Sequence, residues 1–201
     1  MTTPTAAPTV LVGAAPAHRE PRVIGLDVSL RRTGIGSSLG WADHITDRGY
    51  TGLRRLRYVR DAIRTHLTGD VDLAVMEGAA FSRALQRGHD ELSALRWWVA
   101  DAADHAGVPL AVAPSTSVKL FALGKGRLPG KGTARRKAEK DAMIAAARAL
   151  YPDAAVKKDD EADALLMARM GHAWLGTWCL SPTEQRGLAG VAWPEQEVTL
   201  L

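Results

Sequence analysis

Cysteine is nearly absent from this chain, since Cys179 is the only one among its 201 residues. A single thiol cannot form a disulfide within the chain, and it cannot build a metal site that needs several cysteines. Chains without disulfides are typical of reducing compartments. The sequence therefore predicts a cytoplasmic protein.

Long hydrophobic runs are missing as well. No stretch approaches the roughly 20 apolar residues that a membrane span needs, so we expect no membrane partner. The opening residues are rich in proline, threonine and alanine and lack a basic start, which is typical of a flexible tail rather than a signal peptide. We predict a tail at 1–20, one domain at 21–175, and a C-terminal extension at 176–201 that is irregular and packs in part through Trp193.

Acidic residues are scarce in two segments of the chain. Residues 115–140 hold eight basic residues and one acid, and residues 53–64 hold five arginines and one acid. The net charge of the whole chain is only +4, so the remainder is acidic. This division suits a protein that grips a polyanion with one set of residues and holds cations with another. Such charge runs are also common on solvated faces that bind nothing.

Hydrophobic patterning predicts strands that alternate with helices, as in an α/β protein. We expect strands within 22–30, 33–41, 43–52, 71–79 and 108–114, and helices at 53–67, 90–107, 115–123, 133–151 and 160–174. The helix over 133–151 is expected to bury Ala142, Ala145, Ala146 and Leu150.

Four acids stand at the ends of these expected elements. Asp27 closes the first strand, Glu77 closes the fourth, and Asp160 and Asp163 lie three apart at the start of the last helix, on one face. Ligands of α/β proteins gather at strand ends. Four bare carboxylates repel one another, but they suit two divalent cations that prefer oxygen ligands and cleave phosphodiesters. Taken singly, each acid also fits a helix cap or a surface charge.

These residues lie in motifs that resemble those of the RuvC family of Holliday-junction resolvases, members of the RNase H-like superfamily. The matching stretches are GLDVSLRRTGIG, VMEGAAF, VKLFALGKG with RRKAEKDAM, and DDEADALLMA, and the resemblance spans about residues 22–174. Its most specific parts are the Gly-x-Asp-x-Ser-x-x-x-Thr-Gly pattern from Gly25 and the Asp-x-x-Asp-Ala-Leu pattern from Asp160. The order and spacing of the four acids also agree with the family.

The resemblance implies an α/β, RNase H-like fold with a mixed five-stranded sheet flanked by helices, a homodimer, and paired symmetric nicking of a four-way DNA junction. It implies two Mg²⁺ or Mn²⁺ ions per active site, held by Asp27, Glu77, Asp160 and Asp163. Lys119 and Lys137 fall where the family keeps lysines beside the scissile phosphate. The DNA-binding residues are then expected to be Phe81, Arg83, Lys119, Lys125, Arg127, Lys131, Arg135, Arg136 and Lys137.

Several positions differ from the family or leave a choice. The loop at 124–132 is longer and more basic than the family's short glycine turn, and Phe81 is shifted by one position from the family's stacking aromatic. A core position is the alternative for Phe81, and a solvated helix face is the alternative for the two lysines. The helix around Trp97 and Trp98 corresponds to the family's dimer helix, so we expect one tryptophan to face the core and the other a second subunit. Core packing of both tryptophans is the alternative.

Other functions remain open on the sequence alone. An RNase H that cuts RNA–DNA hybrids, or a nuclease for other branched DNA, would use the same acids. A RuvC-like relative with a role in ribosomal RNA processing would share the fold, although that family tends to be shorter and lacks the Asp-x-x-Asp-Ala-Leu ending. A non-catalytic DNA-binding module would keep the fold and the basic segments, but unused clustered carboxylates would only repel one another.

Overall fold

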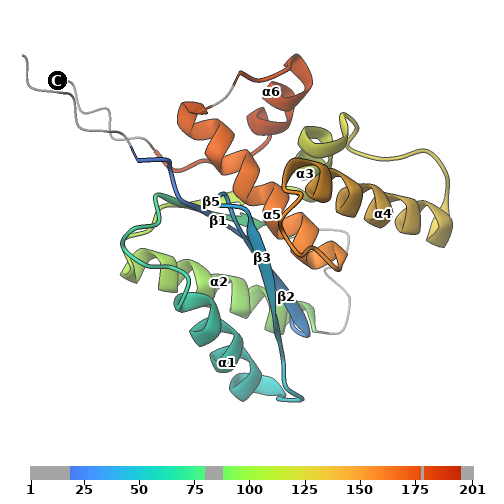
Figure 1. Cartoon of the computed structure of the whole chain (residues 1–201). Coiled ribbons are helices and arrows are strands. Elements are labelled where there is room, and N and C mark those ends of the chain that lie inside the picture. Colours follow the sequence, from blue (N-terminus) through green and yellow to red (C-terminus); the bar gives the residue numbers. More distant parts are fainter. Residues whose placement is uncertain (1–18, 80–87, 178, 196–201) are drawn as a thin grey trace, which may run out of the picture.

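The structure, a computed structural model, describes residues 19–79, 88–177 and 179–195. Within these ranges five strands form one sheet in the order β3-β2-β1-β4-β5 (Figure 1). They are β1 (Val23–Asp27), β2 (Arg32–Ser37), β3 (Trp41–Thr46), β4 (Leu73–Glu77) and β5 (Leu110–Ala113). β2 is antiparallel to β1 and β3, whereas β1, β4 and β5 run parallel. The expected α/β class and mixed five-stranded sheet are confirmed.

Helices cover both faces of this sheet (Figure 1). α1 (Gly52–Arg64) and α2 (His89–His105) bury one face, where Ile24 and Leu26 of β1 point. The other face, where Val23 points, is covered by α3 (Ser115–Leu123), α4 (Gly132–Leu150), α5 (Asp159–His172), the π-helical turn η2 (Ala173–Thr177) and α6 (Pro182–Ala189). No helix of the described residues is both long enough and apolar enough to cross a membrane.

α5 is the central helix of its face and lies unusually close to the sheet. A Cβ atom on Gly25 of β1 would overlap the backbone of α5 at Ala164, and one on Gly34 of β2 would overlap the backbone at Asp160. Only glycine therefore allows this approach. Both glycines belong to the Gly-x-Asp-x-Ser-x-x-x-Thr-Gly motif. This motif thus sets α5 directly against the sheet, with its first turn over β2 at Gly34 and its middle over β1 at Gly25.

The expected buried side of α4 is only partly confirmed, because Ala146 packs against the core and Ala142 is half-buried, whereas Ala145 and Leu150 are exposed. The helix buries Glu139, Met143 and Ala147, which are four residues apart, while Leu150 is 46% exposed. The pattern misled because a charged residue, Glu139, starts the buried row. When Glu139 is left out of the buried row, the apolar pattern of α4 points instead to the neighbouring alanines.

The C-terminal extension contains a helix, so the expectation that it is irregular is wrong. The start of α6 carries a capping box, in which Ser181 and Glu184 each accept the other's backbone N–H. The expected packing of Trp193 is confirmed, because its ring stacks on Trp174 with centroids 4.8 Å apart. Residues 1–18 of the expected tail lie outside the described residues.

Candidate active site

The acids that end β1 and β4 lie beside the first turn of α5. Asp27 and Glu77 are neighbours because their strands are adjacent and parallel. Burial, followed by the charges of Glu77 and Asp163, raises the pKa of Asp27 well above its ordinary value. Burial, followed by the charges of Glu77 and Asp159, raises the pKa of Asp163 to about 7. The structure thus brings Asp27, Glu77 and Asp163 together in a cluster that we call the acid cluster.

The remaining acid, Asp160, is held by an arginine. Its Oδ2 lies 2.5 Å from Nε of Arg32, and its Oδ1 accepts the backbone N–H of Glu161 at 2.9 Å. Its charge still helps to raise the pKa of Asp27, so it lies near the acid cluster. Sequence reasoning missed Arg32, because nothing in the first strand and turn indicates which acid this side chain will meet.

Glu161 is a buried acid with many donors. Arg32 Nη2 donates to its Oε1 at 2.5 Å, and Nδ1 of His44 lies 3.0 Å from the same oxygen. Its Oε2 accepts the backbone N–H groups of Lys157 at 2.6 Å and Lys158 at 3.1 Å. Burial raises the pKa of Glu161, but these hydrogen bonds and positive charges outweigh burial and lower it overall. Glu161 therefore fastens the start of α5 to β2 and β3.

The turn between β1 and β2 is closed by two hydroxyl side chains of the motif. Thr33 donates its Oγ1 hydrogen to the carbonyl of Ser29 at 2.9 Å, and Ser29 donates its Oγ hydrogen to the carbonyl of Arg32 at 2.5 Å. These bonds replace ladder hydrogen bonds that the turn lacks. They fix Arg32 at the start of β2, where it meets the acids of α5.

The donor chemistry of the acid cluster fits a divalent cation. In the described part of the chain, no group of three or more His, Cys, Asp or Glu side chains has the spacing of a ready metal site. Oδ1 of Asp163 is nevertheless buried without a hydrogen-bond partner among these residues. Carboxylate oxygens are the ligands that Mg²⁺ and Mn²⁺ prefer. A cation between Asp27, Glu77 and Asp163 would offset the repulsion that helps to raise the pKa values of Asp27 and Asp163.

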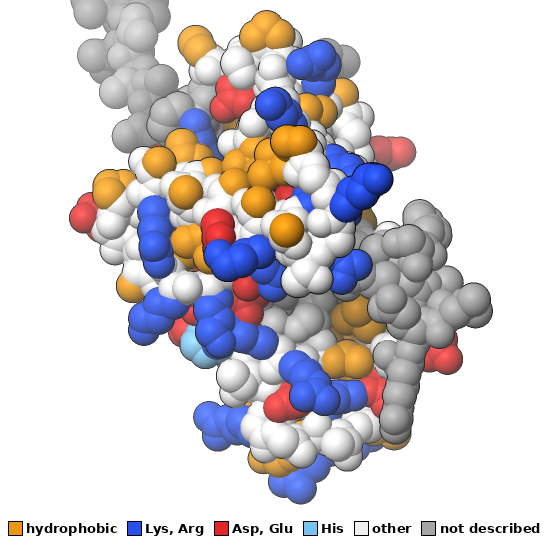
Figure 2. All heavy atoms as spheres, turned by 90° about the vertical axis from the view of Figure 1, so that its right-hand side faces the viewer, with side chains coloured by type: hydrophobic (Ala, Val, Ile, Leu, Met, Phe, Trp, Pro, Cys, Tyr) orange, Lys and Arg blue, Asp and Glu red, His pale blue; other side chains and the backbone are white. Residues whose placement is uncertain are grey.

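A cleft of about 500 Å³ opens onto the acid cluster. One wall is basic and comes from α3 and α4, with Lys119, Arg135, Arg136 and Lys140. Ser29 and Ser115 also line it. Figure 2 shows the side of the molecule that carries α4 and the start of α5, where Lys and Arg side chains surround a few acidic ones. The arrangement suits an anionic ligand drawn by the rim toward cations held below it.

Lys119 is fixed by a buried acid on α4. Its Nζ lies 3.1 Å from Oε2 of Glu139, and Nε of Arg135 lies 3.5 Å from Oε1. The same Oε1 accepts the backbone N–H of Leu128 at 3.3 Å. Burial raises the pKa of Glu139, but the hydrogen bonds and cations lower it overall. Glu139 therefore joins Lys119, α4 and the basic loop 124–132, a role hidden in the sequence by its eight basic neighbours.

Lys137 lies away from the cleft. Its side chain is 77% exposed, and its Nζ lies 2.7 Å from Oδ2 of Asp141 one turn along α4. Lys140 lines the cleft instead, with Nζ 2.5 Å from Oδ2 of Asp159. Arg136 and Lys140 share one side of α4 because they are four residues apart. Helix register thus decides which lysine meets the acids.

Two solved structures of RuvC resemble this chain. One, described as Thermus thermophilus RuvC structure, has a TM-score of 0.59 and 19% identity and covers 78% of this chain and 97% of its own. The chain has a RuvC-like fold. The other, T. thermophilus RuvC in complex with Holliday junction substrate, has a TM-score of 0.56 and 18% identity over the same shares. No protein-family model matches the sequence, and a search of curated proteins found no match.

Seven of the nine expected DNA-binding residues lie in the described part of this RuvC-like fold, and Lys137 is the one on the exposed side of α4. Arg135 and Arg136 line the cleft, as does Lys119. The loop 124–132 carries three exposed cations, Lys125, Arg127 and Lys131. Phe81 and Arg83 lie outside the described residues.

The two tryptophans of α2 in this RuvC-like fold differ in exposure. Trp98 packs against the core between the sheet and α1, and the Cζ atom of Arg60 lies 5.4 Å from its ring centroid. Trp97 is 77% exposed. The expectation that one of the pair faces the core is confirmed, and contact of the other with a second subunit stays a prediction.

Proposed function

We propose that this protein is a metal-dependent endonuclease that resolves four-way DNA junctions by paired, symmetric nicks. The observation that carries the proposal is the acid cluster, whose half-buried carboxylates face one another beside a basic cleft. Buried groups with strongly shifted pKa values in a cleft are typical of functional sites. The junction as substrate is supported by the RuvC-like fold, since one similar structure is RuvC with a Holliday junction.

The acids of this chain would hold the cations. Asp27, Glu77 and Asp163 offer oxygen ligands for Mg²⁺ or Mn²⁺, two ions per site, and Asp160 would join them on release from Arg32. Bound cations of this kind supply an activated water and stabilise the leaving oxygen in phosphodiester hydrolysis. A metal ion binds the deprotonated form of Asp163. Because the pKa of Asp163 is raised, protonation weakens metal binding at low pH.

Two lysines are proposed to hold the scissile strand. The charges of Lys119 and Lys140 both lower the pKa of Asp163, so both amines face the acid cluster. Glu139 and Asp159 fix them before DNA arrives. A fixed positive charge beside the cleaved phosphate offsets the negative charge that develops during the reaction. Lys137 and the loop 124–132 would contact the DNA backbone farther from the nick.

Paired nicks require two active sites, and we propose that a homodimer provides them. The exposed Trp97 on α2 is the side chain that supports this proposal, because large aromatic side chains are enriched in interfaces. Sedimentation velocity of the wild type and of Trp97→Ala measures the association. We expect the wild type to sediment as a dimer and the variant to shift toward the monomer.

Cleavage of defined substrates tests the enzyme proposal. The full chain is incubated with a labelled mobile four-way junction, a linear duplex and an RNA–DNA hybrid, each in Mg²⁺, Mn²⁺ or Ca²⁺. We expect paired nicks in the junction alone, with Mg²⁺ or Mn²⁺ and not with Ca²⁺. Asp160→Asn and Asp163→Asn should abolish them, and Asp153→Asn, an exposed aspartate outside the cleft, should not.

The rival functions give different products. Cutting of the hybrid while the junction is only bound would identify an RNase H. Binding of the junction without cutting in any metal would identify a DNA-binding module. Either result would replace the resolvase proposal.

A further inference from the structure

A second basic surface lies across the β1–β2 turn from the acid cluster. It consists of Arg31 in that turn, Arg48 before α1, and Arg54 and Arg57 on α1, all exposed, and we call it the α1 surface. α1 lies in the lower part of Figure 1, and Figure 2, turned about the vertical axis, shows Lys and Arg side chains on the lower part of the molecule. The surface therefore faces solvent at the end of the sheet where the acids lie.

The charges of the α1 surface are not neutralised by the protein. Among residues 19–79, 88–177 and 179–195, none of its four arginines forms an ion pair with an acid. The basic wall of the cleft differs, because Lys119, Arg135 and Lys140 each lie within 4.0 Å of a carboxylate. Uncompensated guanidinium groups repel one another, and an external polyanion relieves that repulsion.

Aromatic rings hold two of these guanidinium groups. The Cζ atom of Arg54 lies 4.1 Å from the ring centroid of Tyr50, and that of Arg48 lies 5.4 Å from the ring of Tyr58. The two tyrosines meet edge to face, with centroids 5.3 Å apart. A stacked guanidinium keeps the N–H groups at its edge available for phosphate oxygens. These two guanidinium groups are thus held in place before any ligand binds.

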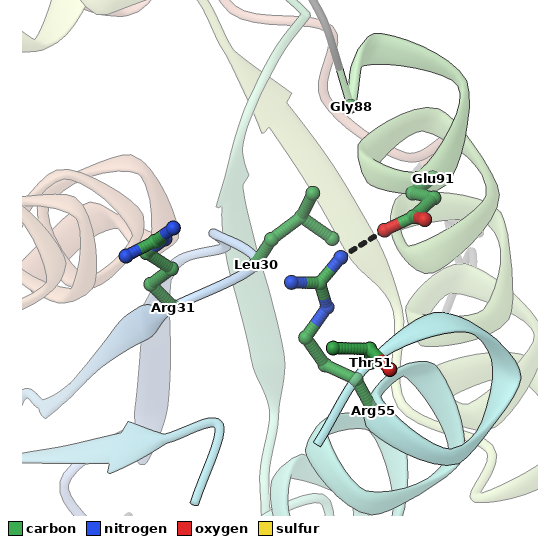
Figure 3. Close-up of a pocket in the computed structure, with 6 residues that line it drawn as sticks. All are labelled: Leu30, Arg31, Thr51, Arg55, Gly88 and Glu91. Carbon is green, nitrogen blue, oxygen red and sulfur yellow. Dashed lines mark hydrogen bonds and ion pairs between the residues drawn. The ribbon is translucent and has the colours of Figure 1, made fainter. Parts of the chain in front are cut away.

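A hollow of about 510 Å³ connects this surface to the turn. Figure 3 shows it between Leu30 and Arg31 of the turn and the starts of α1 and α2. Arg55 points across it and pairs with Glu91, while Arg31 points away from that pair (Figure 3). Ser29, two residues before Arg31, lines the catalytic cleft. A strand that leaves the cleft over this turn therefore meets Arg31 first.

We propose that the α1 surface binds the sugar–phosphate backbone of the DNA arm that leaves the nicking site across the β1–β2 turn. The inference rests on the proposed function, because it takes the nicked DNA as its ligand. The contacts are to phosphates, so they add affinity and orientation without reading sequence. The protein would then grip its DNA on both sides of the acid cluster, with α4 and its loop on one side and α1 on the other.

Binding of the four-way junction in Ca²⁺ tests this inference, because affinity is then measured apart from cleavage. The variants are Arg54→Gln and Arg48→Gln/Arg54→Gln. The matched control is Arg64→Gln, an exposed arginine in the last turn of α1, which lies about 15 Å from Arg54 at 1.5 Å rise per residue. Unchanged thermal midpoints and circular dichroism spectra show that each variant is folded.

We expect the slope of log affinity against log salt concentration to fall by about one unit for Arg54→Gln and about two for the double variant. The double variant should bind about tenfold more weakly at moderate salt, and Arg64→Gln should match the wild type. Equal affinities and slopes for Arg54→Gln and Arg64→Gln would overturn the inference.

Neutral phosphates in the DNA locate the contact. Each phosphate of the arm beside the nick is replaced in turn by an uncharged methylphosphonate. At least one replacement should weaken the wild type and leave Arg54→Gln unaffected, because the interaction is already lost. If every replacement weakens both proteins equally, the α1 surface does not touch that arm.

Cleavage in Mg²⁺ separates this inference from the proposed function. A wild type that binds with the expected salt dependence but does not cut would overturn the nuclease proposal while supporting the surface. A wild type that cuts, with arginine variants that bind normally, would overturn the surface alone.

Discussion

Buried and half-buried acids occur in two opposite electrical environments at the same end of this molecule. Glu139 and Glu161 are each surrounded by cations and N–H groups, and their pKa values are lowered. Asp27 and Asp163 face other acids, and their pKa values are raised. The first pair is satisfied by the chain itself and holds elements together. The negative charges of Asp27 and Asp163 are neutralised only in part by the protein, so a bound cation would stabilise this pair most.

The largest effect should come from breaking the acid cluster. Asp163→Asn is expected to lower junction cleavage by about a thousandfold or more, equivalent to about 4 kcal/mol of transition-state stabilisation. The same change removes a repelling charge, so the free energy of unfolding in metal-free buffer should not fall. Cleavage rates and urea unfolding of the same preparation measure both. A variant that loses stability as well as activity would erase the contrast with Glu161.

The pH dependence of stability sharpens the contrast next. The native state raises the pKa of Asp163 from 3.8 to about 7, so it binds this proton more tightly than the unfolded chain does. The stability that this proton confers is complete below the unfolded pKa and is lost as pH rises through about 7. The loss amounts to up to about 4 kcal/mol.

Urea unfolding of the metal-free wild type and of Asp163→Asn isolates the Asp163 contribution. The measurement runs from pH 5 to pH 8, because most of the expected loss of stability falls within this range. We expect the wild type to lose stability relative to the variant as pH rises. Saturating Mg²⁺ should reduce the difference, because a bound cation favours the deprotonated form. Parallel curves for the two proteins would show that Asp163 ionises normally.

Removing a satisfied acid should have a smaller but clear effect. Glu161→Gln takes the charge from Arg32 and His44 and leaves them beside the start of α5. Removing one partner of a buried ion pair leaves the other charge uncompensated, and this is expected to lower the free energy of unfolding by about 3 kcal/mol. Urea unfolding at neutral pH measures it, and Asp153→Asn, an exposed acid, is the control. An unchanged midpoint would mean that Glu161 does not fasten the helix.

The smallest effect is expected at Glu139. Glu139→Gln weakens the links to Lys119, Arg135 and the N–H of Leu128, which should cost about 1 to 2 kcal/mol. The basic loop should then open more often, so trypsin should cut faster at Lys125, Arg127 or Lys131. Asp141→Asn, which faces solvent with Lys137, is the matched control. Equal digestion of the two variants would contradict a bond between Glu139 and the loop.

The strands and acids were readable from the sequence because they depend on local pattern. Asp27 and Glu77 are the last residues of two apolar strands, and Asp163 lies near the start of an apolar helix. The partners of the acids were not readable, because they come from distant elements and exact helix register. Arg32 meets Asp160 across 128 positions, and Lys140, three residues beyond Lys137 on α4, is the lysine that lines the cleft. The helix α6 was missed, although its start signal of Ser181, Pro182 and Glu184 is local and could have been recognised.

The glycines beneath α5 have a consequence for how the protein tolerates change. Because Gly25 and Gly34 touch main-chain atoms of the helix, the spacing between Asp27 and the aspartates above it is set by the thickness of two backbones. Side chains deeper in the core can be exchanged for others of similar volume without moving that spacing. Such substitutions elsewhere in the sequence therefore leave the geometry of the acids unchanged. A single methyl group added at either glycine is the change that would disturb it.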